Sequence, residues 1–550
     1  MFLQKLDFNN QDTRVKKYVM PKKIMKTTGR IINARKLLTS MERQIFLQEK
    51  TLTVLTTTPE SKAGILLDFG FEFSGGAILG IHTVSGGKEA KIRLSFGESA
   101  NEALADLGYK GACNDHSPRD FVFSAQNFSV NELGNTGYRF LYIELLTECT
   151  VSIKSVQGVF YYQPLEYCGS FECSDPLLNR IYDTAAYTCH LCIQNEIWDG
   201  IKRDRLVWVG DMSPEMKTIK YVFGEIPQMT GGLEVSAQHA PLPQWMNTMP
   251  TYSLWWLIIL EEWCFYTGNY ALAQRQRQYI LGLIQQILAN IDSNGVFTAG
   301  SFIDWPSNDT SAAVAGTKGL TALCLQACVK LCGYFGEKQL EQQCGLILSK
   351  MSACRENCGG MKQIAALLTL AGMADTDCVR VLKQGGPKGF STFMSYYILT
   401  AMARFCNEKQ VLGALKKYYG AMLKLGATTF WEDFDISWTE NACRIDEICD
   451  GSKTDVHGDN GKYCYQGFRH SLCHGWSSGP VPFLTEYVLG VHILESGCKT
   501  VELKPHLGDL CYARGSIATP KGKLEVEHIR TEDGKIKTRA VAPKGIRILY

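Results

Sequence analysis

The first third of the chain alternates hydrophobic and polar residues with a period of two. These short stretches are separated by Gly, Asn and Ser, which is typical of strands joined by turns. The predicted strands are Thr51–Thr57, Gly64–Phe71, Ala77–Thr83, Lys91–Gly97, Tyr138–Thr147 and Val151–Tyr162, with a turn at Glu72–Gly76. The pattern predicts an antiparallel β-sandwich over residues 1–165, and a generic β-domain without a ligand fits it equally well.

The hydrophobic period changes to that of a helix near residue 166. Asp175 followed by Pro176 is a helix-start signal, because proline fits the first turn of a helix. The predicted helices cover residues 176–195, 212–223, 252–267, 271–291, 316–334, 337–357, 361–372, 391–405 and 408–424. Many consecutive helices in one domain indicate a bundle, a solenoid or an (α/α) toroid. The lack of a repeated sequence of fixed period counts against a simple solenoid.

Strand patterns return after about residue 500. The predicted strands are Val501–Lys504, Leu524–Ile529, Lys535–Val541 and Gly545–Tyr550. This segment is too short to be an independent domain, so we expect it to pack against the helical one. The predicted organisation is an N-terminal β-sandwich at residues 1–165, an all-helical domain at 166–499 and a C-terminal β-segment at 500–550.

Composition narrows the classes of partner. The chain has 550 residues and a formal net charge of +2, which gives no electrostatic reason to expect nucleic acid or an anionic membrane as a partner. The longest apolar stretch, Leu254–Leu260, is far too short to span a bilayer and indicates a buried helix. The many Trp, Tyr and Phe residues supply faces that can stack on sugar rings, although most of them must fill cores.

The cysteine pattern indicates reduced thiols. The chain has 21 cysteines, and Cys324, Cys328 and Cys332 recur every four residues as small apolar groups on one helix face. Reduced thiols, and an N-terminus (residues 1–26) without signal-peptide features, predict a cytoplasmic protein. The clusters Cys189–Cys192 and Cys354–Cys358 lack a second ligand pair at zinc-site spacing, so no metal is expected. No nucleotide or haem motif indicates a cofactor.

Four segments concentrate residues suited to carbohydrate chemistry. Trp198–Glu215 holds four acids, three cations and two Trp, which is typical of a functional loop on a rigid scaffold or of a structural ion-pair network. Asp304 and Trp305 precede a helix, although a plain turn has the same residues. Glu432 follows two aromatic residues, and an ordinary surface acid is equally consistent. His474 lies near Trp476, and a satisfied buried His is the commoner case.

Together these segments meet the needs of glycoside hydrolysis. One carboxylic acid protonates the leaving oxygen, a carboxylate activates water or attacks directly, and aromatic and polar groups hold the ring. The sequence resembles the α-L-rhamnosidases of glycoside hydrolase family 78, whose hallmark is Asp, then Arg-Glu-Arg, then Gly-Trp-x-Gly-Asp. Asp199, Arg203, Trp208, Gly210 and Asp211 stand at matching spacing. Asp304-Trp305, Ala427–Glu432 and Ser471–His474 are similar to further family segments, in the same order.

The resemblance implies a fold and a set of roles. The fold is an (α/α)6 toroid flanked by an N-terminal β-sandwich and a small C-terminal β-domain, and the activity is inverting hydrolysis of terminal α-L-rhamnosides. Glu432 falls on the position of the general base. The positions that bind the sugar or shape its pocket are Asp199, Arg203, Trp208, Asp211, Asp304, Trp305 and His474.

The sequence departs from the family pattern at the general acid. The family has Glu where this chain has Asp204, which is shorter by one methylene, a reach of about 1.5 Å. Three interpretations stay open: a backbone that lies closer, proton donation by Glu215 instead, or a slow or differently specialised protein. A second departure is the long stretch between Trp438 and Tyr465, which we expect to form a loop near the mouth of the site.

The leading hypothesis is an exo-acting glycosidase that releases rhamnose from small glycosides or oligosaccharides. A catalytically weak carbohydrate-binding protein is the alternative from another class, and the Asp204 departure is the only feature in its favour. A toroid enzyme acting on another sugar, or a lyase, is a third; a lyase would need a Tyr or His base and more concentrated cations. The aglycone, the linkage and the oligomeric state, a homodimer included, stay open.

Overall fold

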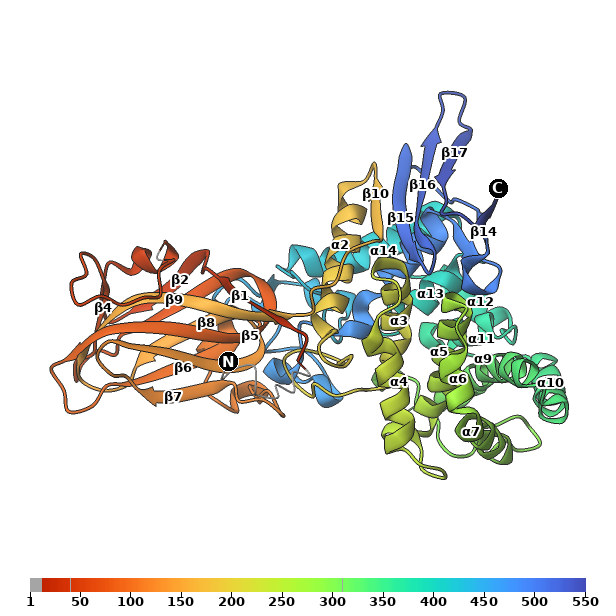
Figure 1. Ribbon diagram of the computed structural model, residues 1–550, viewed down its shortest axis with the longest axis horizontal. Helices are drawn as coiled ribbons and strands as arrows, with labels where there is room; N and C mark the ends of the chain where they lie inside the picture. The colour runs from red at the N-terminus through yellow and green to blue at the C-terminus, as the bar shows by residue number, and fades with distance from the viewer. Residues whose placement is uncertain (1–11, 40, 309) are drawn as a thin grey trace, which may run out of the picture.

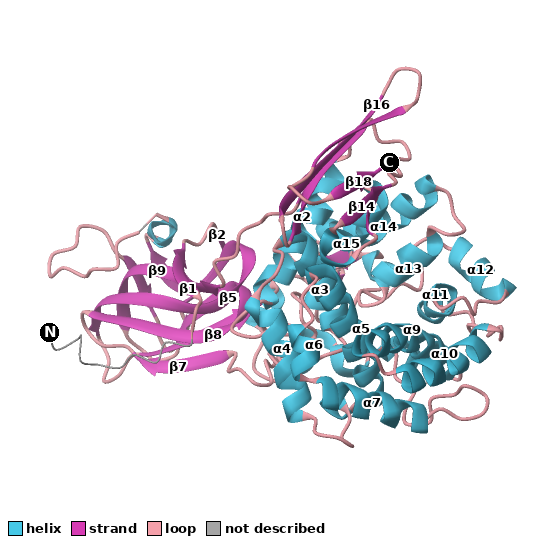
Figure 2. Cartoon of the chain, turned by 45° about the vertical axis from the view of Figure 1, so that its right-hand side comes forward, coloured by secondary structure: helices cyan, strands magenta, loops and turns pink. Residues whose placement is uncertain are grey.

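The computed structural model describes residues 12–39, 41–308 and 310–550. The first eleven residues of the N-terminal segment considered above lie outside the described residues. Strands gather at one end of the molecule, helices make up the larger part, and strands from the C-terminal region pack beside the helices (Figure 1, Figure 2). The prediction of several domains, one helical and others rich in strands, is confirmed.

The N-terminal region is one nine-stranded, largely antiparallel sheet. Its path runs β3-β4-β9-β5-β8-β6-β7, and β1 and β2 pair with β9 and β5. The strands are β1 (Val15–Val19), β2 (Lys23–Thr28), β3 (Arg30–Ile32), β4 (Thr53–Thr56), β5 (Gly64–Ser85), β6 (Lys91–Gly97), β7 (Asp120–Ser124), β8 (Ser129–Leu145) and β9 (Thr150–Tyr162). Apolar side chains from these strands form a core of their own, separate from that of the helices.

The predicted turn at Glu72–Gly76 is wrong, because β5 runs through it without a break. The register of β5 shifts between Asp68 and Phe73 and again between Gly75 and Ala77, so the extra residues are absorbed as bulges. A Cβ atom at Gly75 would lie 1.8 Å from the carbonyl oxygen of Val159. Glycine is therefore required here for close approach of two strands and not for a turn.

Helices α2 to α15 form the central region. They are α2 (Pro176–Cys192), α3 (Met212–Val222), α4 (Pro227–His239), α5 (Pro250–Thr267), α6 (Ala271–Arg275), α7 (Arg277–Ala289), α8 (Trp305–Asn308), α9 (Ala312–Phe335), α10 (Lys338–Ser352), α11 (Lys362–Leu370), α12 (Thr376–Lys383), α13 (Ser395–Met402), α14 (Glu408–Lys424) and α15 (Pro480–Phe483). Each helix contacts the next in the order α3, α5, α9, α11, α13 and α15, and α15 contacts α3 again. These six helices therefore form a closed cycle.

Helix α9 is long and apolar enough to cross a membrane by length and composition. Its most apolar window is 72% buried inside the protein, against α5, α10 and α11. Cys324, Cys328 and Cys332 on this helix are fully buried, which confirms their predicted packing as small apolar groups. The apolar composition of α9 is therefore explained by its burial as a core helix of the closed cycle.

The C-terminal strands form two small sheets. One is β10 (Ser170–Cys173), β15 (Tyr512–Thr519), β16 (Gly522–Arg530) and β17 (Ile536–Val541), and the other is β13 (Val491–Ile493), β14 (Thr500–Leu503) and β18 (Arg547–Leu549). Strand β10 comes from the segment before the first helix of the central region and pairs with β15. This pairing ties the two ends of the helical region together.

Candidate active site

A cavity of about 230 Å³ collects most of the residues that the four sequence segments predicted. Its lining comes from the loop between α2 and α3, the start of α5, the start of α8 with the residues just before it, the segment after α14 and the stretch before α15. The lining residues are Asp199, Arg203, Asp204, Trp208, Asp211, Met249, Tyr252, Phe302, Trp305, Glu432, Cys464, Arg469, His474 and Trp476. Segments more than 200 residues apart in sequence therefore meet at one site.

Backbone hydrogen bonds fix these segments to one another. The His474 N–H donates to the Phe430 carbonyl oxygen at 3.1 Å, and the Glu432 N–H donates to that of Ser471 at 2.9 Å. The Gly475 N–H donates to the carbonyl oxygen of Asp199 at 2.8 Å. Because backbone groups make these contacts, the relative positions of the three loops do not depend on flexible side chains.

The carboxylate of Glu432 is buried and held on both oxygens. Oε1 forms a close ion pair with Nη2 of Arg203, and Oε2 accepts a hydrogen bond from the Ser471 N–H at 3.1 Å. Nε2 of His474 lies 3.6 Å from Oε1. Only 4% of the side chain is exposed, and that part faces the cavity. A fixed carboxylate on a cavity wall is suited to accept a proton from a bound water.

Asp204 lies on the cavity wall beside the same arginine, with Oδ1 3.3 Å from Nη1 of Arg203. Asp204 and Arg205 both have left-handed backbone torsions, with φ of 52° and 57°. Such a turn is unfavourable for residues other than glycine and needs support from its surroundings. The N-terminal region provides it: the ring of His116 hydrogen-bonds the Asp204 carbonyl at 2.8 Å, and Arg205 donates to the Asn135 carbonyl at 2.7 Å.

Glu215 does not fit its predicted role as the alternative acid. It is 1% exposed and does not line the cavity, and neither carboxylate oxygen has a hydrogen-bond partner among the described residues. A Cβ atom at Gly475 would lie 1.5 Å from Oε1 of Glu215, so the glycine makes room for this carboxyl group. Burial raises its pKa well above the ordinary value. Glu215 is thus a buried carboxyl group behind the cavity wall.

Asp199, Asp211 and His474 form the polar floor of the cavity. Nε2 of His474 lies 3.8 Å from Asp199 Oδ2 and 3.7 Å from Asp211 Oδ2, which is beyond hydrogen-bond distance. The Leu206 N–H donates to Asp199 Oδ1, and the Tyr252 hydroxyl donates to Asp211 Oδ1, both at 3.0 Å. Burial, followed by neighbouring carboxylates for Asp199, raises the pKa of both aspartates well above the ordinary value. Such groups can donate hydrogen bonds to sugar hydroxyls as well as accept them.

Aromatic rings form the outer walls. Trp208 meets Tyr252 edge to face at 6.0 Å between centroids, and Trp305 stacks on Tyr463 at 5.9 Å. Tyr463 belongs to the long segment after Trp438, so this segment does reach the mouth of the site. Flat rings at these positions can cover the apolar face of a sugar.

Asp304 differs from the prediction that it binds substrate. It does not line the cavity, and its oxygens accept hydrogen bonds from Ser307 Oγ at 2.5 Å and Ser391 Oγ at 2.7 Å. A short polar residue at the start of a helix commonly binds the first turn in this way. Asp304 therefore holds the position of Trp305.

Six lining residues were not predicted from the sequence. Trp476 follows His474 by two positions in a segment already singled out, and Cys464 and Arg469 lie in or just after the long loop expected at the mouth. Phe302 lies in the segment of Asp304 and Trp305. Met249 and Tyr252 carry no motif, so only the packing of α5 reveals them.

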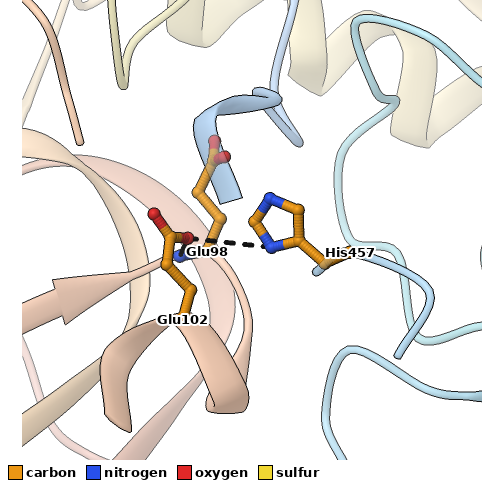
Figure 3. Close-up of side chains that lie close together, drawn as sticks. All are labelled: Glu98, Glu102 and His457. Atoms are coloured by element: carbon orange, nitrogen blue, oxygen red, sulfur yellow. Dashed lines mark hydrogen bonds and ion pairs between the residues drawn. The ribbon is translucent and has the colours of Figure 1, made fainter. Parts of the chain in front are cut away.

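A buried ion network lies behind the cavity, between the N-terminal sheet and the loops. Nζ of Lys202 lies 2.8 Å from Glu102 Oε1 and 3.3 Å from Glu98 Oε2, and it donates to the carbonyl of His470 at 2.9 Å. Glu98, Glu102 and His457 lie close enough together to hold a metal ion (Figure 3). The ammonium of Lys202 already contacts both carboxylates, so we assign the cluster as an ion network and no metal to it.

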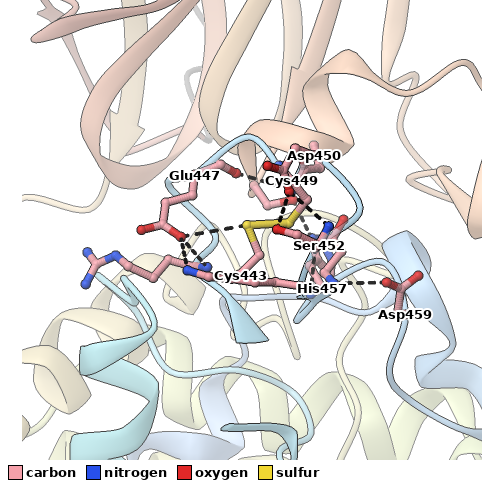
Figure 4. Close-up of a disulfide and its surroundings, with 12 residues drawn as sticks. Cys443, Glu447, Cys449, Asp450, Ser452, His457 and Asp459 are labelled. Carbon is pink, nitrogen blue, oxygen red and sulfur yellow. Dashed lines mark hydrogen bonds and ion pairs between the residues drawn. A yellow bond between two sulfur atoms is a disulfide. The ribbon is translucent and has the colours of Figure 1, made fainter. Parts of the chain in front are cut away.

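The prediction that every thiol is reduced is wrong for one pair. Cys443 and Cys449 form a disulfide, with their Cα atoms 6.0 Å apart (Figure 4), and the other 19 cysteines are free. The bridged loop packs on the N-terminal region, where the Ala100 N–H donates to the Ile445 carbonyl at 2.8 Å. The two cysteines are only six residues apart, and the turn between them brings their side chains together.

A larger cavity of about 810 Å³ adjoins the first, and Asp433 lines it next to Glu432. Burial raises the pKa of Asp433 from its ordinary value of 3.8 to about 7.

Between about pH 4 and pH 7 the folded protein therefore keeps a proton on Asp433 that the unfolded chain releases, so stability should fall as pH rises through this window. We expect the Asp433→Asn variant to lose less stability than wild type between pH 4 and pH 7, measured as the unfolding temperature. Equal pH dependence would contradict the assignment.

Comparison with known proteins finds a matching domain model and similar folds. Residues 166–312 match the bacterial α-L-rhamnosidase six-hairpin glycosidase domain. No curated protein matches the sequence significantly. The family 78 rhamnosidase of Bacillus sp. GL1 has a TM-score of 0.75 at 22% identity, covering 94% of this chain and 55% of that one.

Two further solved structures share the fold. The Klebsiella oxytoca rhamnosidase with rhamnose bound has a TM-score of 0.66 at 17% identity, covering 86% of this chain and 96% of that one. The Streptomyces avermitilis α-L-rhamnosidase complexed with L-rhamnose has a TM-score of 0.67 at 13% identity, covering 88% of this chain and 48% of that one. The chain thus spans about half the length of the Bacillus and Streptomyces enzymes. The resemblance predicted from the four motifs is confirmed: the chain is similar to bacterial α-L-rhamnosidases in sequence over residues 166–312 and in fold over most of its length.

Proposed function

We propose that this chain is an exo-acting glycoside hydrolase that removes terminal α-L-rhamnose with inversion of configuration. The observation that carries the proposal is the placement of Asp204 and Glu432 on either side of the Arg203 guanidinium, in one cavity with aromatic walls. A volume of about 230 Å³ is smaller than a typical pocket for a drug-sized ligand, so it suits one terminal sugar and not a chain. The match to a rhamnosidase domain and the rhamnose-bound neighbours support the identity of that sugar.

Each carboxyl group has a defined part in the proposed reaction. Glu432 accepts a proton from water as the water oxygen attacks the anomeric carbon. Asp204 donates a proton to the glycosidic oxygen as the bond to the leaving group breaks. Inverting enzymes keep their two carboxyls about 6.5–9.5 Å apart so that water fits between sugar and base. Asp199, Asp211 and His474 bind the hydroxyl groups, and Trp208 and Trp305 cover the ring.

We propose an (α/α)6 toroid for the helical region and a sandwich for the N-terminal sheet. The closed cycle of contacts through α3, α5, α9, α11, α13 and α15 supports the toroid, since six inner helices define that fold. The long strand β5, which pairs with β2, β8 and β9 along its length, supports a sheet folded over its own core. The domain limits at residues 165 and 499 belong to the same proposal.

The role of Asp204 is tested with two leaving groups. We expect Asp204→Asn to lower kcat on an alkyl α-L-rhamnoside by about 10²- to 10⁴-fold, because the leaving alkoxide needs a proton. The loss should be much smaller on p-nitrophenyl α-L-rhamnoside, whose leaving group needs little protonation. The exposed Asp509→Asn is the control. Wild-type activity of Asp204→Asn on the alkyl rhamnoside would exclude Asp204 as the acid.

One observation favours the binding-protein alternative: both oxygens of Glu432 already have partners, Oε1 in Arg203 and Oε2 in the Ser471 N–H. Rhamnose binding by wild type without release of product from either rhamnoside would establish that alternative.

A cytoplasmic location, without a nucleic acid or membrane partner, is also a proposal. The 19 free cysteines support it and the Cys443–Cys449 disulfide opposes it, and labelling of thiols in intact cells decides between them.

A further inference from the structure

The 810 Å³ cavity lies beside the sugar cavity. Its lining continues that of the sugar cavity at three places: Pro306 follows Trp305, Asp433 follows Glu432, and Tyr463 precedes Cys464. The Trp305–Tyr463 stack therefore stands between the two cavities. Phe390, Phe434 and Trp438 supply apolar faces to the larger one.

Positive charge without a counter-ion is concentrated in this larger cavity. Lys362 is only 5% exposed, and its Nζ donates to the Gly386 carbonyl and lies 5.4 Å from the centre of the Phe390 ring. It forms no ion pair with a described residue, and neither do the exposed Lys388 and Lys462. The other cation of the lining, Arg380, is paired with Asp377.

The acidic residues of the lining do not cancel this charge. Asp459 pairs with Lys110, which lies outside the cavity, and Asp435 accepts hydrogen bonds from Ser437. Asp433 forms no ion pair with a described residue, and burial raises its pKa to about 7, so it is partly neutral near pH 7. The cavity therefore holds more unpaired positive than negative charge.

Burying an ammonium group without a counter-ion is unfavourable for folding. Burial lowers the pKa of Lys362 to about 8, which reflects that cost. Lys362 is also the first residue of α11, whose N-cap Met361 has no side-chain oxygen to bind the first-turn N–H groups. The positive end of this helix adds to the attraction for an anion. A charge that destabilises the fold and faces a cavity is best explained by a ligand.

We propose that the larger cavity binds the leaving group of the substrate and selects one that carries a carboxylate, as a uronic acid residue does, through an ion pair with Lys362. This inference rests on the proposed rhamnosidase function. The carboxylate would meet the ammonium, the helix start and the apolar faces together, while its rhamnosyl end occupies the smaller cavity.

The test compares two disaccharides that differ only at C6 of the second sugar: α-L-rhamnosyl-(1→4)-D-glucuronate and α-L-rhamnosyl-(1→4)-D-glucose. We expect wild type to hydrolyse the glucuronate with a kcat/KM about 10- to 100-fold higher, the effect of one hydrogen bond to a charged group. Lys362→Met, which is nearly as long and removes the charge, should bring the ratio close to one. Lys362→Arg should keep most of the preference, and Lys383→Met, an exposed lysine on α12 outside the cavity, should not change it.

Two different failures are distinguishable. Equal rates of wild type on the two disaccharides, or an unchanged ratio in folded Lys362→Met, would overturn the inference while leaving the rhamnosidase proposal intact. Absence of hydrolysis of both disaccharides and of p-nitrophenyl α-L-rhamnoside would overturn the proposed function and the inference with it. Unfolding temperatures of the variants verify the fold, and removal of a buried charge should not lower that of Lys362→Met.

Discussion

Glu432→Gln is expected to lower kcat for α-L-rhamnoside hydrolysis by about 10²- to 10⁴-fold, because an amide cannot accept the proton of the attacking water. Glutamine has nearly the same size, and its carbonyl oxygen can still accept from the Ser471 N–H that holds Oε2 at 3.1 Å. KM should therefore change less than kcat. The measurement is kcat and KM on p-nitrophenyl α-L-rhamnoside, where leaving-group protonation contributes little.

A control and a rescue separate this chemistry from damage to the site. Glu440→Gln removes an exposed acid from the same segment and should leave both constants unchanged. Glu432→Ala should recover activity with added azide, which attacks without a base, and should form the β-L-rhamnosyl azide. Glu432→Gln with near wild-type kcat, or Glu432→Ala without rescue, would argue against Glu432 as the base.

Lys202→Met is expected to destabilise the protein by about 3–5 kcal/mol, the usual effect of removing one partner from a buried ion cluster. The ammonium contacts Glu98 and Glu102, all three side chains are nearly inaccessible, and burial already raises the pKa of Glu98 to about 8. Without the lysine, two carboxylates would face each other in an apolar environment. The measurement is the free energy of unfolding from guanidinium denaturation.

The exposed Lys17→Met on β1 is the matched control and should change stability by less than about 0.5 kcal/mol. Combining Lys202→Met with Glu102→Gln should recover part of the loss, because one of the two unpaired charges is removed. An unchanged unfolding midpoint in Lys202→Met would show that the network contributes nothing to the junction of the N-terminal sheet and the helices.

The helical period predicted most of the central region well. Residues 408–424 were predicted as a helix and form α14 with the same limits, because an Asn407–Gln410 capping box marks its start. Helix α4 was missed, since Gly231 and Gly232 weaken its helical pattern. Helix α12, with eight residues, was missed as well. In β5 the glycines required by bulges were interpreted as a turn.

The site was predicted where short motifs carry it and missed where packing carries it. Asp199, Asp204 and Glu432 come from motifs, and all three line one cavity. Tyr252 lies inside an apolar helix with no local signal. The pairing of Lys202 with Glu98 and Glu102 joins residues about 100 positions apart, and no spacing rule connects them. The occupied hydrogen bonds of Asp304 and the burial of Glu215 are likewise visible only in three dimensions.

The most direct test of the central claim is the configuration of the first product. Proton NMR follows the anomeric signals while wild type hydrolyses an alkyl α-L-rhamnoside, with Glu432→Gln as the control. The account predicts that β-L-rhamnose appears first and then equilibrates with the α-anomer, and that Glu432→Gln forms neither at a comparable rate. First appearance of α-L-rhamnose, or unchanged product formation by Glu432→Gln, would contradict hydrolysis by inversion between Asp204 and Glu432.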